Sequence, residues 1–288
     1  MKAHRFLREQ CAFLCEGGSM DLEYLKQNWR RKPIHLEAEI AAWDSSAEEY
    51  VYEKKNNFSE DPFLRFVSEK VQLTKEDKVL DVGCGAGAYS VAFAEYVKQA
   101  DGVDLSPRMV QLGNEYAIKN GIKNVSLRVM NWHTEDVSDM KGQYDIVFAH
   151  TTPAVIDYET LKKMCDTSKR HCFLCKPARR KDMVFDELKR LAGIEATEGM
   201  DDSVSYAFDS LWGWGYNPEI SYAEIVWKPR KTLEEANAWF LGRLKGRYSI
   251  DAKTEERLKA YLQSISKNGF VEERIDTTLV NMYWRKNV

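Results

Sequence analysis

The residues best placed to do chemistry are three glycines that separate an apolar strand from a helix. Gly83, Gly85 and Gly87 directly follow the apolar segment 78–82. Glycines let the backbone turn sharply, so a ligand can lie against bare main chain and face the N–H groups that open the next helix. Asp104 ends a second apolar stretch about twenty residues later, where a carboxylate is placed to accept hydrogen bonds from a ribose diol. This spacing predicts a site for a nucleoside ligand.

Two nucleoside ligands compete for the site. A dinucleotide motif requires G-x-G-x-x-G or its alanine variant, and Gly83, Gly85 and Ala88 satisfy the looser form. Asp81 instead favours S-adenosylmethionine, because a carboxylate two residues before Gly83 is placed to bind a ligand ammonium. Nicotinamide cofactors offer no ammonium at that position. The turn also lies about eighty residues into the chain, whereas a dinucleotide domain often begins near its first strand.

Strands and helices that alternate from residue 78 to residue 177 must position these side chains. We expect strands over 78–82, up to Asp104, 125–129, 144–149 and 170–175, and helices over 88–98, between Ser106 and Asn120, 154–165 and 182–191. Strands separated by helices predict a doubly wound, mostly parallel sheet with helices on both faces.

The flanking regions are less regular. Residues 1–77 read as helical, and residues 195–218 are aromatic without a clear period. A strand is expected over 222–227. Two helices follow, one from a capping box at Thr232 and one over about 254–267, before a last strand over 279–284.

Composition limits the classes of partner. The chain has 288 residues, of which 44% are apolar and 30% charged, and its formal net charge of −3 supplies no general field for nucleic acid. It has neither an apolar segment long enough to cross a membrane nor an apolar signal core near its start. We therefore expect a cytoplasmic protein that binds neither nucleic acid nor membrane.

Six cysteines are too few to suggest a disulfide scaffold in a chain of this length. Cys172 and Cys175 have C-x-x-C spacing, but they lie in a predicted strand, where residues three apart point to opposite faces. We interpret them as buried structural thiols and predict no metal site.

Several segments together resemble class I S-adenosylmethionine-dependent methyltransferases. Residues 80–87 resemble the first motif of that family, an acidic residue followed by Gly-x-Gly-x-Gly, and residues 102–106 resemble the second. Met130-Asn131-Trp132 falls where the family binds adenine, and residues 144–149 resemble its fourth strand. The resemblance covers roughly residues 60–177 and, more loosely, the C-terminus.

The resemblance implies a Rossmann-like α/β fold with a seven-stranded sheet that ends in an antiparallel hairpin. The segments 222–227 and 279–284 would be the last two strands, with a helical insertion between them. We divide the chain into a helical N-terminal lid (1–60), a cofactor-binding core (61–194) and a segment that completes the same sheet (195–288).

The resemblance also implies a role for each residue of the turn. Gly83, Cys84, Gly85 and Gly87 would lie against the methionine part of S-adenosylmethionine, Asp81 would hold its ammonium, Asp104 would bind the ribose, Leu105 or Met109 would cover the adenine, and Asn131 and Trp132 would contact the adenine edge. The family often has aspartate where this chain has Asn131. Asp104 also has an alternative interpretation, as a cap near the helix that begins after Ser106.

Residues after the fourth strand would lie beside the transferred methyl group, because ligands bind beyond the carboxyl ends of the strands. His150 is the candidate base or substrate-orienting group, and its alternative role is packing over the ligand. His133 reads as a surface histidine. Trp43, Trp212 and Trp214 are tentative substrate contacts, since aromatic surfaces suit a planar or cationic molecule. The rings at 212 and 214 have an equally good interpretation as cover for the sheet edge.

The resulting prediction is an S-adenosylmethionine-dependent methyltransferase with a small-molecule acceptor and an in-line displacement mechanism. The alternatives are a non-catalytic protein that binds S-adenosylmethionine and a nicotinamide-dependent oxidoreductase. A third is a thiol-using enzyme, which would need Cys165, Cys172 and Cys175 to converge near the methyl group. The sequence leaves the acceptor and the oligomeric state open.

Overall fold

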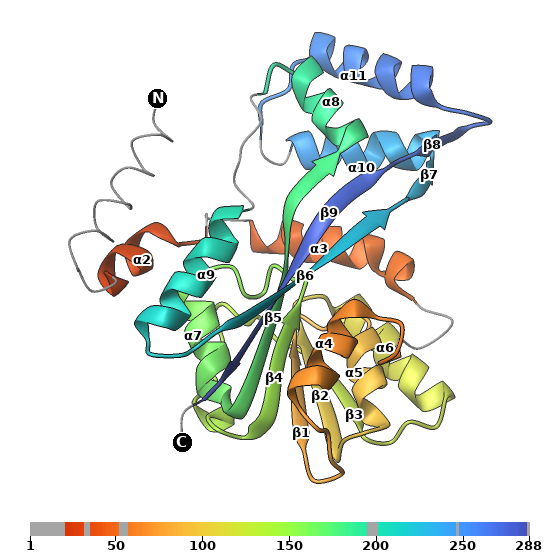
Figure 1. Cartoon of the computed structure of the whole chain (residues 1–288). Coiled ribbons are helices and arrows are strands. Elements are labelled where there is room, and N and C mark those ends of the chain that lie inside the picture. The colour runs from red at the N-terminus through yellow and green to blue at the C-terminus, as the bar shows by residue number, and fades with distance from the viewer. Residues whose placement is uncertain (1–20, 32–34, 52–56, 195–200, 246–247, 287–288) are drawn as a thin grey trace. The chain divides into compact units, whose positions relative to one another are not determined.

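The computed structural model describes residues 21–31, 35–51, 57–194, 201–245 and 248–286 (Figure 1). Contacts within the chain divide it into two units. The first contains residues 1–175, 205–220 and 281–288, and the second contains 176–204 and 221–280. All of the site residues predicted above belong to the first unit.

Seven strands form one sheet in the order β3-β2-β1-β4-β5-β9-β6. They are β1 (Lys78–Val82), β2 (Gln99–Asp104), β3 (Val125–Val129), β4 (Tyr144–His150), β5 (Ser168–Asp182), β6 (Glu219–Trp227) and β9 (Ile275–Arg285). β1 to β5 pair in parallel. β9 runs antiparallel to β5, because Lys286 N donates to Arg170 O near one end while Thr277 Oγ1 donates to Ala178 O near the other. The predicted α/β fold with a mostly parallel seven-stranded sheet is confirmed.

β5 is longer than predicted. It continues from Cys175 to Asp182 through two lysines, a proline, an alanine and two arginines, with exposed and buried residues interspersed. The expected strand ended at 175 because this charged continuation lacks the apolar run of a buried strand.

The two central strands are buried on both faces, which explains their continuous apolar sequences. Val79, Leu80 and Val82 of β1 are fully buried, as are residues 146–149 of β4. Asp81 is the one acidic residue within this stretch of β1, and it is also buried.

Four helices of the first unit accompany these strands: α4 (Pro62–Lys70), α5 (Ala88–Ala94), α6 (Pro107–Lys119) and α7 (Tyr158–Thr167). Ser106 caps α6 as predicted, by accepting a hydrogen bond from Met109 N. α7 begins later than the expected 154, because Asp157 and Thr160 form the capping box that starts it. None of the helices in the described ranges is long and apolar enough to span a membrane.

The N-terminal region is helical where the structure describes it, with α2 (Leu22–Asn28), α3 (Leu36–Ser46) and the 3₁₀ turn η1 (Ala47–Tyr50). Residues 1–20, 32–34 and 52–56 of the predicted lid lie outside the described residues. α9 (Asp201–Gly213) corrects the expectation of an irregular aromatic segment. Its buried residues Ala207 and Leu211 are one helical turn apart, a stripe too narrow to stand out among the surrounding aromatic residues.

The second unit contains α8 (Met183–Leu191), α10 (Leu233–Lys245) and α11 (Ala252–Ile265). Of these, α10 and α11 form the expected helical insertion between β6 and β9. The predicted capping box also forms, since Thr232 N donates to Glu235 Oε2 (2.7 Å) and Glu235 N donates to Thr232 Oγ1 (3.2 Å). β7 (Arg230–Thr232) and β8 (Phe270–Glu272) pair antiparallel. They were missed because three residues are too few to show a period of two.

Candidate active site

A cavity lies at the carboxyl ends of β1, β2, β3 and β4. The predicted residues that line it are Trp43, Asp81, Gly83, Cys84, Gly85, Asp104, Leu105, Met109, Asn131, Trp132 and His150. Segments up to about a hundred residues apart in sequence are thus brought to one place. A parallel sheet presents its ligand-binding loops at this end.

The glycine turn is held to β2 by main-chain hydrogen bonds. Gly83 N and Cys84 N both donate to Val103 O, at 2.8 and 3.0 Å. Gly83 has a φ of 74°, and a Cβ there would overlap the Thr152 side chain, so only glycine fits. Gly87 caps α5 but does not line the cavity, and a Cβ on it would lie 2.6 Å from Leu127 Cδ1. The structure therefore gives Gly87 a packing role against β3.

Asp81 lies beneath the turn with a buried carboxyl group. Ser90 Oγ donates to Asp81 Oδ2 at 2.9 Å. Burial raises the pKa of Asp81 to about 8, and the hydrogen bond from Ser90 opposes that rise only in part. The carboxyl group is therefore mostly neutral at pH 7 in the absence of ligand, and a cationic ligand group beside it would favour its ionised form.

Asp104 joins the turn to the start of α6. Its Oδ2 accepts from Gly85 N at 2.8 Å and its Oδ1 accepts from Ser106 N at 2.9 Å. Burial raises the pKa of Asp104, while these N–H groups favour the charged form. Both interpretations of this residue thus have a structural basis, because a carboxylate oxygen that accepts one hydrogen bond can accept a second from a ribose hydroxyl.

The wall formed by α6 is supported by α3. Met109 is buried against Ala47 and Ala86, with Trp43 packed on the same cluster. Asp44, the neighbour of Trp43, accepts hydrogen bonds from Ser106 Oγ and from Arg108 N at the start of α6. A carboxylate at a helix N-terminus is favourable, so Asp44 anchors α3 beside the cavity.

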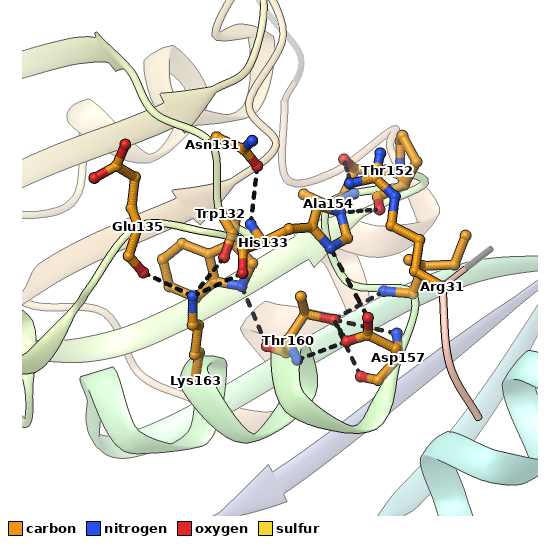
Figure 2. A network of polar contacts seen from close by, with 12 residues as sticks. Arg31, Asn131, Trp132, His133, Glu135, Thr152, Ala154, Asp157, Thr160 and Lys163 are labelled. Atoms are coloured by element: carbon orange, nitrogen blue, oxygen red, sulfur yellow. Dashed lines mark hydrogen bonds and ion pairs between the residues drawn. The ribbon is translucent and has the colours of Figure 1, made fainter. Parts of the chain in front are cut away.

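The loop after β3 lines the cavity with residues 130–133. A network of polar contacts holds this loop in place (Figure 2). Asn131 Oδ1 accepts from His133 N at 3.1 Å, and Trp132 is buried with its Nε1 donating to Thr160 O at 3.2 Å. Lys163 of α7 donates to three carbonyl oxygens of this loop, those of Trp132, His133 and Glu135, at 2.9, 3.2 and 2.7 Å. The ammonium group therefore satisfies three carbonyl groups of the loop beside the turn hydrogen bonds that Thr134 N and Glu135 N donate to Asn131 O.

Replacing Lys163 by methionine is expected to destabilise the protein by about 1–3 kcal/mol and to speed amide exchange over residues 131–136, because three carbonyl groups lose a charged donor. Lys162→Met is the matched control on the same helix. Lys162 pairs with Asp166 at 3.4 Å on the surface, where such pairs contribute about 0–1 kcal/mol. Urea unfolding and hydrogen exchange measure both effects, and equal losses in the two variants would contradict this role of Lys163.

His150 ends β4 at the cavity. Its ring packs against Phe63 and Tyr89, with centroid distances of 4.8 and 4.2 Å. Burial lowers the pKa of His150 to about 3, so the imidazole is neutral at physiological pH. The next residue, Thr151, has a φ of 48°, which is unusual for a β-branched residue and marks local strain beside the cavity.

Some cavity residues were missed or misplaced by the sequence. His133 is half-buried at the cavity rather than on the surface, with Nε2 at 3.3 Å from Pro153 O and Nδ1 at 3.9 Å from Asp157. Arg31 and Glu39 form an ion pair in the wall, and Tyr89 lies there too. Tyr89 could have been predicted from the sequence, because it is a polar aromatic residue in the first helical turn after the glycines. No sequence pattern identifies Arg31 as a cavity residue.

Trp212 and Trp214 do not line the cavity, contrary to their tentative assignment. Trp212 is 55% exposed and stacks on Phe208, while Trp214 Nε1 donates to Tyr158 OH at 2.9 Å. Cys165, Cys172 and Cys175 are buried and do not line it either, which removes the thiol-using alternative. Among the described residues, no group of three His, Cys, Asp or Glu is arranged to hold a metal ion.

Residues 73–194 match a family described as a methyltransferase domain. This segment of the chain is thus similar to known methyltransferase domains. It is 31% identical over 97 residues to an uncharacterized methyltransferase, YcgJ, of Bacillus subtilis, covering 34% of this chain and 38% of that one. It is also 34% identical over 93 residues to a ribosomal protein L11 methyltransferase of Campylobacter fetus, covering 32% of each. The similarity thus spans well under half of these curated relatives.

The methyltransferase fold extends over most of the chain. The chain is similar to a solved structure of phosphoethanolamine N-methyltransferase 2 from Haemonchus contortus, in complex with phosphomonomethylethanolamine and S-adenosylhomocysteine. The similarity covers 93% of this chain and 66% of that one. Its TM-score is 0.53 and its sequence identity 14%, so the similarity concerns the fold alone.

Proposed function

We propose that this protein binds S-adenosylmethionine and transfers its methyl group to a small molecule. The observation that carries the proposal is the convergence of Asp81, Asp104 and His150 around one cavity at the ends of three neighbouring strands. A buried carboxyl group that ionises beside a cation fits a ligand ammonium, and an acceptor beside a glycine turn fits a ribose diol. Asp81 and Asp104 would thus contact the two ends of one nucleoside amino acid.

S-adenosylmethionine, when bound, supplies an electrophilic methyl group on a sulfonium. Gly83 and Gly85 let its methionine portion approach the main chain, and Leu105 and Met109 offer an apolar surface to its adenine. His150 orients the acceptor by accepting a hydrogen bond from its nucleophilic atom. A neutral imidazole of such low pKa suits orientation better than storage of a proton, and alignment alone can supply much of the rate enhancement.

A small-molecule acceptor is supported by the cavity wall. Trp43 and the Arg31–Glu39 pair stand beside the residues assigned to the cofactor, which favours an acceptor that enters the cavity. The net charge of −3 adds no general attraction for nucleic acid. The small-molecule class of the acceptor and the cytoplasmic location stay predictions.

Calorimetric titration tests the ligand. S-adenosylmethionine is expected to bind with a Kd on the order of 1–100 μM, and NAD to give no heat of binding. Asp104→Asn should weaken binding about tenfold or more by removing a charged acceptor. The matched control is Asp101→Asn on the same strand, since Asp101 accepts from Tyr144 OH and does not line the cavity. Preference for NAD, or equal effects of the two substitutions, would overturn the proposal.

A further inference from the structure

A chain of polar contacts reaches His150 from outside the residues assigned to the cofactor. Tyr89 OH donates to Asp61 Oδ2 at 3.0 Å and lies 3.2 Å from His150 Nε2. On the other side of the ring, His150 Nδ1 lies 3.2 Å from Thr151 Oγ1. The order Asp61–Tyr89–His150–Thr151 joins four residues of the first unit.

The hydrogen atoms available along these polar contacts determine the tautomer of the imidazole. A phenol has a single hydroxyl hydrogen, and the Asp61 carboxylate can only accept, so the Tyr89 hydroxyl donates its one hydrogen bond to Asp61. Burial and the adjacent Asp61 raise the pKa of Tyr89, which keeps that proton on the phenol. The Tyr89 oxygen then faces His150 Nε2 with lone pairs only. Nε2 must therefore carry the ring proton, and Nδ1 is left as the acceptor.

The surroundings determine which nitrogen an acceptor molecule can reach. The Nε2 contact with Tyr89 is partly buried, whereas the Nδ1 contact with Thr151 is exposed and Thr151 lines the cavity. Phe63 and Tyr89 pack against the imidazole and restrict its rotation. A hydroxyl or amine in the cavity can replace the Thr151 hydroxyl as the donor to Nδ1.

We propose that Asp61 and Tyr89 are positioning residues that hold His150 as the Nε2–H tautomer, so that Nδ1 accepts the hydrogen bond from the methyl acceptor. The catalytic half of this inference rests on the proposed methyl transfer. The tautomer itself is a property of the ligand-free protein and can be tested without any substrate.

Asp61→Asn is the decisive substitution because it changes one atom and keeps the helix cap. Asp61 Oδ1 caps α4 by accepting from Leu64 N at 2.9 Å, and asparagine caps as well as aspartate. With its oxygen held by that bond, the asparagine presents its NH₂ group where Oδ2 contacts Tyr89. Tyr89 then accepts a hydrogen bond from residue 61 instead of donating one, and its own hydroxyl hydrogen points to His150 Nε2. The tautomer is expected to invert to Nδ1–H.

Nitrogen-15 NMR of histidine-labelled protein at neutral pH reads the tautomer directly, with His150 assigned from the His150→Gln spectrum. The expected results are Nε2–H in the unaltered protein, Nδ1–H in Asp61→Asn and a mixture in Tyr89→Phe, which keeps the ring but has no hydroxyl. The control is Asp251→Asn, the same change at the N-cap of α11, which should leave the His150 signals unchanged. Nδ1–H in the unaltered protein, or the same tautomer in Asp61→Asn, would overturn the proposal.

Kinetics separate the positioning role from the proposed function. Asp61→Asn should lower kcat about tenfold or more, because a misaligned acceptor loses part of the rate enhancement that orientation supplies, and change the Kd of S-adenosylmethionine less than about twofold. An inverted tautomer with unchanged kcat would refute the catalytic half. If S-adenosylmethionine fails to bind the unaltered protein, the proposed function fails, and the NMR result still decides whether Asp61 and Tyr89 set the tautomer.

Discussion

Replacing Gly113 by alanine is expected to destabilise the protein by about 2–3 kcal/mol, although alanine is the better helix former. Gly113 is buried inside α6. A Cβ there would lie 2.5 Å from the carbonyl oxygen of Ala86 and would overlap the Leu127 side chain. The gain in helix propensity is about 1 kcal/mol, whereas forcing a methyl group against main chain costs more. Because Ala86 belongs to the glycine turn, S-adenosylmethionine binding should weaken as well.

Gly242→Ala in α10 is the matched control, since a Cβ at that position meets open space. It should gain about 0.5–1 kcal/mol from helix propensity and reduced freedom of the unfolded chain. Urea unfolding of both variants measures the difference in sign. Stabilisation in both would mean that α6 packs less tightly on the turn than described.

Asp81→Asn is expected to weaken S-adenosylmethionine binding about a hundredfold while stabilising the ligand-free protein at pH 7. The loss follows from removing the charge that would pair with the ligand ammonium in a buried site. The gain follows from the raised pKa of Asp81. Between pH 4 and about 8 the folded carboxyl group holds a proton that the unfolded chain has released, so this group lowers stability as pH rises through that window.

Thermal unfolding from pH 5 to pH 8 measures this effect. The ligand-free Asp81→Asn variant should exceed the unaltered protein in stability by a margin that widens with pH, by at least about 1 kcal/mol at pH 7. The affinity of the unaltered protein for S-adenosylmethionine should rise toward pH 8 as Asp81 ionises. A margin independent of pH would show that Asp81 is already ionised in the folded protein.

The sequence predicted the part of the site that depends on local pattern. The turn at Gly83 and Gly85 and the aspartates before and after it all lie within one strand–helix–strand unit, from β1 through α5 to β2, so their spacing was sufficient to predict them. His150 followed from its position at the end of a strand. Long apolar runs likewise located β1 and β4, because strands buried on both faces have no polar alternation to confuse them.

The rest depends on contacts between distant segments. Arg31 reaches the cavity through the placement of α2 and α3, and the contact between Tyr89 and His150 joins residues 61 apart in sequence. No local period encodes either contact. The assignment of Trp212 and Trp214 failed for the opposite reason, since the aromatic composition of the segment suggested a pocket, whereas α9 and the turn after it place these side chains outside the cavity.

Asp44 shows that the segment similar to known methyltransferases is supported by residues outside it. Residues 73–194 contain the whole glycine turn and α6, but the carboxylate that anchors the start of α6 comes from α3, outside that segment. The same boundaries omit β9 and β6, so they would leave β5 as a bare sheet edge. The stretch that is similar to known methyltransferases is thus shorter than the stretch that builds the sheet and supports the cavity.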